Sequence, residues 1–131
     1  ILYHQGQYSQ TRKLMELVQR DAQDVFFKLE AKLYSMRASY ELNDLDLSED
    51  NYNALRMYLK RDKLLPRVSR DNYLLFINLL NRLWNIVQEP ATAAKKRRKF
   101  EALLAKVLEA PATSNFLWVR EKVAVELARI G

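Results

Sequence analysis

A short tyrosine-containing element occurs twice in this chain, with a helix-ending residue at the same place in each copy. Residues 3–8 read YHQGQY and residues 40–45 read YELNDL, so the same 37-residue interval separates Tyr3 from Tyr40 and Gly6 from Asn43. Glycine and asparagine most readily take the left-handed conformation that ends a helix. Helix ends that recur at this interval between helical stretches are typical of stacked helical hairpins.

The composition favours helices and one domain. Of 131 residues, 49% are hydrophobic, and only two are Gly and three are Pro, which argues against disorder, collagen and a turn-rich β fold. This length suffices for one hydrophobic core. The absence of Cys excludes disulfides, thiolate zinc sites and cysteine nucleophiles, and favours a cytoplasmic location. Because Ile1 lies in what we expect to be the end of a helix, we expect a C-terminal fragment of a longer protein.

Apolar periodicity and capping residues predict about six helices. They cover residues 9–19, 25–42, 48–61, 73–87, 93–109 and, after a cap at Thr113 or Ser114, the stretch to about Ile130. Pro66 is expected to stop one helix and Ser69 to cap the next. Helix 25–42 has two apolar stripes, as an interior helix of a layered array requires. The stripes are Phe26, Leu29, Leu33, Met36 and Tyr40, and Phe27, Ala31, Tyr34 and Ala38.

These patterns predict an all-α fold, a right-handed stack of about three antiparallel helical hairpins that forms an α-solenoid. We expect a single domain over residues 1–131, with degenerate hairpins in 1–66 and capping helices in 67–131. The later helices no longer keep the repeat period, and the final ones have one apolar face, which suits the closing end of an array. Aromatic residues at helical spacing are expected in the core. These are Tyr34, Tyr40, Tyr52, Tyr58, Tyr73, Trp84 and Trp118.

Several segments carry a family resemblance. The pattern Tyr3-x-x-Gly6-x-Tyr8, followed by Leu14 and Leu17, resembles the turn and second helix of a tetratricopeptide repeat, and residues 26–42 resemble the first helix of the next repeat. Residues 56–63, 72–76 and 118–122 resemble the C-terminal region of uncharacterised bacterial tetratricopeptide-like proteins. The chain departs from the pattern at Thr11 and Asn43, and its helices after Ser69 are longer. The resemblance implies a non-enzymatic scaffold for protein–protein interaction or assembly, without catalytic residues or cofactors.

An array of this kind predicts a partner-binding surface on its concave side. That side is lined by the first helix of each hairpin, which makes Arg37, Asn78, Asn81 and Arg82 candidates for contact with a protein or peptide partner. The sequence identifies neither the partner nor the oligomeric state.

The positive charge is concentrated in the middle of the chain. Residues 56–99 contain twelve Lys or Arg and three acids, and the sharpest feature is the run Lys95, Lys96, Arg97, Arg98 and Lys99. Nucleic acid, an anionic membrane surface and an acidic protein tail all suit this run, so binding of nucleic acid or an anionic surface is the alternative function. The other interpretation is a solvated helical face whose Phe100 and Leu103 pack inward.

Residues able to support catalysis or metal binding are sparse. His4 is the only histidine, and we expect it to be exposed to solvent. Asp44, Asp46, Glu49 and Asp50 match part of a calcium loop but lack its central glycine, so we expect a turn and a charged helix start. No glycine-rich phosphate loop or nucleophile elbow is present. The longest apolar stretch, Tyr73 to Leu80, is much shorter than the roughly 20 residues that span a bilayer.

Overall fold

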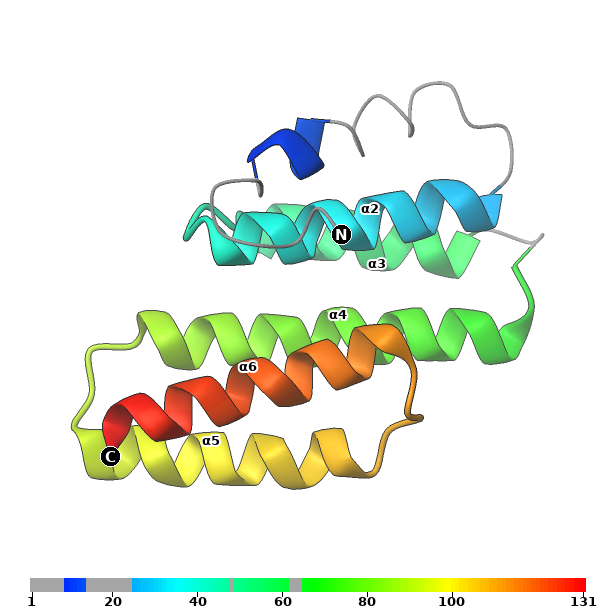
Figure 1. The fold of residues 1–131 in the computed structure, drawn as a ribbon. Helices are drawn as coiled ribbons and strands as arrows, with labels where there is room; N and C mark the ends of the chain where they lie inside the picture. The colour runs from blue at the N-terminus through cyan, green and yellow to red at the C-terminus, as the bar shows by residue number, and fades with distance from the viewer. Residues whose placement is uncertain (1–8, 14–24, 48, 62–64) are drawn as a thin grey trace. The chain divides into compact units, whose positions relative to one another are not determined.

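The computed structural model describes residues 9–13, 25–47, 49–61 and 65–131 (Figure 1). Within these ranges the chain is helical without β-strands, so the all-α prediction is confirmed. Residues 9–13 are helical, and the longer helices are α2 (Val25–Glu41), α3 (Glu49–Arg61), α4 (Arg67–Gln88), α5 (Ala93–Leu108) and α6 (Ser114–Ile130). The chain divides into two compact units, Ile1–Arg70 and Asp71–Gly131, with the division in the first turn of α4.

In the first unit, α2 and α3 run antiparallel (Figure 1). Both predicted stripes of α2 contribute buried side chains, which are Leu29, Leu33 and Met36 from one and Ala31 and Ala38 from the other. Phe27 departs from the prediction because 55% of its surface is exposed. An ion pair between Arg12 and Asp44 joins the helical segment 9–13 to the turn after α2.

The end of α2 has the geometry that its sequence predicts. Asn43 takes a left-handed conformation with φ of 55°. The amide of Asp44 donates to the carbonyl of Ser39 at 2.8 Å, which satisfies a carbonyl in the last turn of the helix. The prediction that Asn43 ends this helix is therefore confirmed. The matching residue in the first copy of the element, Gly6, lies outside the described residues.

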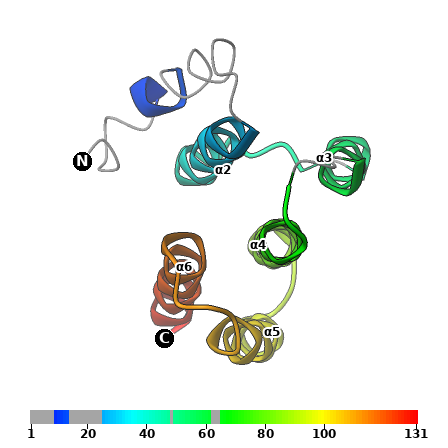
Figure 2. The same ribbon diagram turned by 90° about the vertical axis from the view of Figure 1, so that its right-hand side faces the viewer.

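The second unit contains α4 from Asp71 on, α5 and α6, and each helix runs antiparallel to the one before it (Figures 1 and 2). Phe76 of α4 is almost completely buried, and its ring contacts those of Phe116 and Trp118 of α6 with centroids 6.4 and 6.5 Å away. Such edge-to-face and tilted arrangements suit the charge distribution of aromatic rings. The apolar faces of all three helices contribute to this core. Its other members include Ile77, Leu79, Leu80, Leu83, Phe100, Leu103, Val107, Val119 and Val123.

The start of α4 differs from the prediction. The helix begins at Arg67, directly after Pro66, instead of following a cap at Ser69. The amide of Arg70 donates to the carbonyl of Pro66 at 2.9 Å, which forms the first helical turn. Proline suits a helix start because its fixed φ is compatible with the helix and the first amides need no intrahelical acceptor. Pro66 therefore initiates α4, and Ser69 lies inside its first turn.

Candidate partner-binding site

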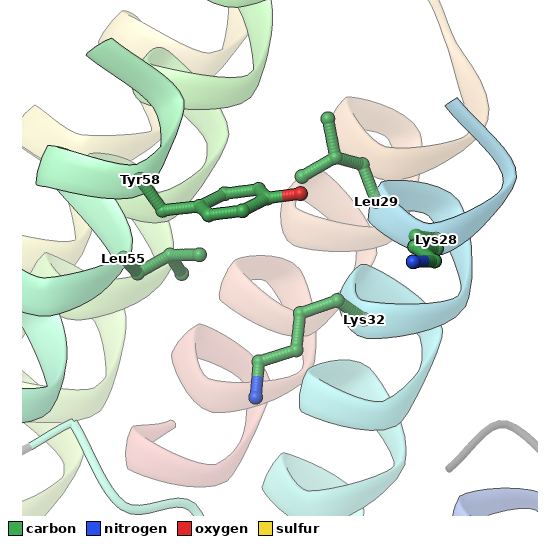
Figure 3. Close-up of a pocket in the computed structure, with 5 residues that line it drawn as sticks. All are labelled: Lys28, Leu29, Lys32, Leu55 and Tyr58. Atoms are coloured by element: carbon green, nitrogen blue, oxygen red, sulfur yellow. The ribbon is translucent and has the colours of Figure 1, made fainter. Parts of the chain in front are cut away.

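A pocket of about 240 Å³ opens between α2 and α3, within the first unit (Figure 3). Leu55 and Tyr58 reach into it from α3, and the Tyr58 ring points across to Leu29 of α2. Lys28 and Lys32 complete the lining from α2. The pocket therefore has a mainly apolar wall with two ammonium groups on one side.

Helical spacing explains why these side chains come together. Lys28 and Lys32 are four residues apart, and Leu55 and Tyr58 are three apart, so each pair lies on one helix face. Neither lysine makes a hydrogen bond or ion pair with another residue in the described part of the chain. The described lining also contains no acidic side chain. Within the described ranges, no acidic group therefore neutralises the positive charge beside the pocket.

Helix α3 leaves part of its apolar surface exposed. Among its described side chains only Leu59 is buried, whereas Met57 and Tyr58 are each 45% exposed. Tyr58 was expected in the core, and that expectation is wrong because the described residues leave this face of α3 open. Tyr73 and Trp118, by contrast, are buried as expected. An exposed apolar face beside a pocket is typical of a surface that binds another molecule.

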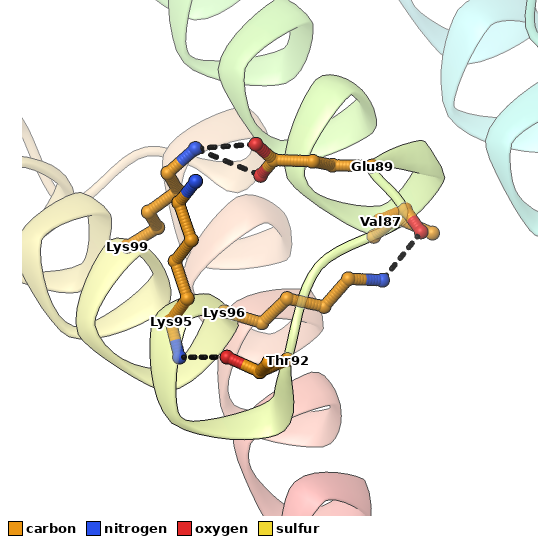
Figure 4. A network of polar contacts seen from close by, with 6 residues as sticks. All are labelled: Val87, Glu89, Thr92, Lys95, Lys96 and Lys99. Atoms are coloured by element: carbon orange, nitrogen blue, oxygen red, sulfur yellow. Dashed lines mark hydrogen bonds and ion pairs between the residues drawn. The ribbon is translucent and has the colours of Figure 1, made fainter.

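The basic run at the start of α5 contains two lysines that bond to the end of α4 and the residue after it (Figure 4) and three exposed side chains. Lys96 donates to the carbonyl of Val87 at 3.2 Å, near the end of α4, and Lys99 donates to both carboxylate oxygens of Glu89. Lys95, Arg97 and Arg98 are exposed. The guanidinium groups of Arg97 and Arg98 contact no partner among the described residues. Three of the five predicted cations thus remain available to a ligand.

The lysines between the end of α4 and the start of α5 favour the charged form of Glu89. The hydrogen bond from Lys99 is the largest effect and holds the pKa of Glu89 below its ordinary value of 4.5, with further lowering from the charges of Lys99, Lys95 and Lys96. Partial burial acts in the opposite direction. Glu89, Thr92, Lys95 and Lys96 also line an open depression of about 590 Å³. Its charge is mixed, unlike that of the α2–α3 pocket.

The four predicted partner contacts do not share one environment. Arg37 lies in α2 and is only 7% exposed, with its guanidinium carbon 4.9 Å from the centroid of the Tyr34 ring. Asn78 of α4 is exposed, and Asn81 and Arg82 are half-buried. Arg37 belongs to the first unit and the other three to the second. Their role in partner binding stays a prediction.

The acidic residues that resemble part of a calcium loop have other partners. Asp44 pairs with Arg12, and Asp46 accepts a hydrogen bond from the side-chain amide of Asn51 at 2.7 Å. In the residues that the structure describes, no three His, Cys, Asp or Glu side chains are grouped to hold a metal ion. His4 lies outside those residues. The described helices also include none that combines the length and apolarity needed to cross a membrane.

Comparisons with known protein families, curated proteins and solved structures found no match to this chain. The resemblance to tetratricopeptide repeats therefore rests on the sequence patterns alone.

The α2–α3 pocket was not predicted from the sequence. The spacing of Lys28 with Lys32, and of Leu55 with Tyr58, indicates two mixed helix faces. Spacing does not reveal that these faces oppose each other across an opening, because that depends on how the hairpin closes.

Proposed function

We propose that this chain is a protein-interaction module, built from stacked tetratricopeptide-like hairpins, that binds a partner protein through the α2–α3 pocket. The observation that carries the proposal is the opening between Leu29, Leu55 and Tyr58, which leaves apolar surface available next to two lysines. Tyr58 is 45% exposed, so part of its ring is accessible to a partner at the pocket. Aromatic side chains in such positions often dominate the binding energy of protein interfaces.

The size of the pocket favours a protein ligand over a small-molecule substrate. Sites that enclose a drug-sized ligand usually measure roughly 300–1,000 Å³. A cavity of about 150 Å³ already accommodates benzene. The volume of about 240 Å³ therefore suits one large side chain that projects from a partner. Burial of one such side chain contributes on the order of 2 kcal/mol, and the exposed face of α3 would supply further contacts.

Site-specific photo-cross-linking tests this proposal. A photoreactive phenylalanine analogue replaces Met57, which is exposed on α3, and in a matched variant it replaces Leu117, which is similarly exposed on α6. Each chain is mixed with an extract of its source cells, and adducts are identified by mass spectrometry. We expect a specific protein adduct from position 57 that disappears when Tyr58→Ala is added. Equal adducts from both positions, or none from position 57, would contradict the proposal.

Binding to an anionic polymer is the second candidate function. The exposure of Lys95, Arg97 and Arg98 favours it. Each phosphate neutralised on DNA contributes roughly 0.9 to the salt dependence of binding, so three cations predict a slope of only about 3. Proteins that bind DNA tightly make about 6–10 such contacts. The negative charge of Glu89 beside the run weakens this candidate further.

A further inference from the structure

We infer that the α2–α3 pocket recognises an acidic peptide segment, in which one bulky apolar side chain enters the pocket and neighbouring Asp or Glu side chains meet Lys28 and Lys32. This inference rests on the proposed function and specifies the chemistry of the partner. It follows from three properties of the site: the volume and lining of the pocket, the charge beside it, and the placement of that charge.

The apolar lining defines the anchor. Leu29 forms a buried wall, and Leu55 and Tyr58 form the opposite one (Figure 3). Apart from the two lysines, the described lining offers the aliphatic side chains of two leucines and the phenol ring of Tyr58, without a carboxylate or amide. A Leu, Met or Phe side chain matches both this chemistry and a volume of about 240 Å³.

The two lysines define the charge next to that anchor. Lys32 is exposed and Lys28 half-exposed, and both line the pocket. Because neither has a partner among the described residues, an incoming carboxylate does not have to displace an existing ion pair. Their four-residue spacing means that the two side chains leave α2 about one helical turn apart. A partner with a single acid can contact one of them, and two acids can contact both.

Charge also distinguishes this site from the corner between α4 and α5. There Glu89 already pairs with Lys99, and Lys96 donates a hydrogen bond to a backbone carbonyl. At the α2–α3 pocket neither lysine pairs with another described residue, and both lie beside apolar surface. The complementary ligand must therefore combine negative charge with an apolar side chain, which a peptide does and a sugar–phosphate backbone alone does not.

A random peptide library tests this inference. Sixteen-residue peptides displayed on phage are selected on the immobilised 131-residue chain, and selected sequences are counter-screened on the Tyr58→Ala variant. Peptides that need Tyr58 are then titrated by fluorescence anisotropy. We expect them to share a bulky apolar residue flanked by Asp or Glu. We also expect Lys28→Glu/Lys32→Glu to weaken their binding at least about tenfold, because carboxylates then face like charges.

The matched control is Lys95→Glu/Arg98→Glu, which changes the net charge equally at exposed positions of the second unit. Its effect measures long-range electrostatics, and we expect it to be less than about threefold. Circular dichroism verifies that both double variants remain helical. Tyr58-dependent peptides that are neutral or basic, or that bind the two double variants equally, would overturn the inference while leaving the proposed function intact. Failure to select any Tyr58-dependent peptide would contradict the proposed function itself.

Discussion

The ammonium group of Lys99 donates hydrogen bonds to both carboxylate oxygens of Glu89, at 2.6 and 2.8 Å (Figure 4). Glu89 follows α4 and Lys99 lies in the second turn of α5, so this contact links the two helices beyond their connecting loop. Lys96 makes a second link through the carbonyl of Val87. Part of the basic run therefore stabilises a helical corner, which explains how several cations are accommodated at a helix N-terminus despite the unfavourable dipole.

The Glu89–Lys99 contact predicts a specific pH dependence of stability. Because the pKa of Glu89 is lower in the folded chain than its ordinary value of 4.5, its contribution is fully present above about pH 4.5 and is lost as the pH falls through the folded pKa. Urea unfolding of the wild type and of Glu89→Gln measures this difference. We expect the wild type to be more stable near neutral pH and the two to converge in acid. A constant difference at all pH values would refute the assignment.

The aromatic cluster of the second unit predicts a large effect of one core substitution. Phe76 is 1% exposed and contacts two rings of α6. Phe76→Ala should lower the free energy of unfolding by about 3–5 kcal/mol, because it removes buried surface and leaves a cavity. The control is Leu75→Ala on the same helix, where the side chain is 39% exposed. Chemical denaturation should show a much smaller loss there, and equal losses would contradict this description of the core.

The left-handed conformation of Asn43 predicts opposite effects of two small substitutions. Asn43→Gly should preserve or slightly increase stability, since glycine adopts a φ of 55° without a steric penalty. Asn43→Ala should destabilise the chain by about 1 kcal/mol, because a Cβ without a compensating polar group is disfavoured there. Thermal unfolding followed by circular dichroism gives both values. If alanine is tolerated as well as glycine, the backbone conformation at this turn is different.

The exposed cations of α5 predict a weak, salt-sensitive affinity for nucleic acid. With three cations available, binding of a labelled DNA duplex should fall with a log–log slope of about 3 or less as salt increases. Lys95→Glu/Arg98→Glu should abolish it, whereas Lys28→Glu/Lys32→Glu should leave a measurable part. A slope well above this value would raise nucleic-acid binding above peptide binding as the function of the chain.

Local signals in the sequence predicted much of the helical structure. The predicted limits of α2, α5 and α6 agree with the structure within one residue, because apolar periodicity and residues such as Asn43 act over a few positions. The start of α4 was misplaced because Pro66 was interpreted only as a stop, although it also suits a first turn. The exposure of Phe27 and Tyr58 was missed because periodicity shows that a face is apolar, and not whether another element covers it.

The candidate site was harder to predict than the helices, because it depends on contacts between residues that lie far apart in the sequence. Five consecutive bases indicated one charged patch, but sequence could not show that Lys99 pairs with Glu89 ten residues away or that Lys96 reaches Val87. In the same way, Lys28 and Lys32 gained significance only when Leu55 and Tyr58 were found across the pocket from them. Side chains that combine into a site across two helices cannot be paired by spacing within either one.

Nuclear magnetic resonance of the isotopically labelled chain, titrated with a Tyr58-dependent peptide, maps the peptide-binding surface residue by residue. We predict that the largest amide and methyl shift changes lie around Lys28, Leu55 and Tyr58, on the facing sides of α2 and α3, and that Tyr58→Ala abolishes them. Changes centred instead on Lys95, Arg97 and Arg98 at the start of α5 would show that the peptide binds there and would contradict binding at the α2–α3 pocket.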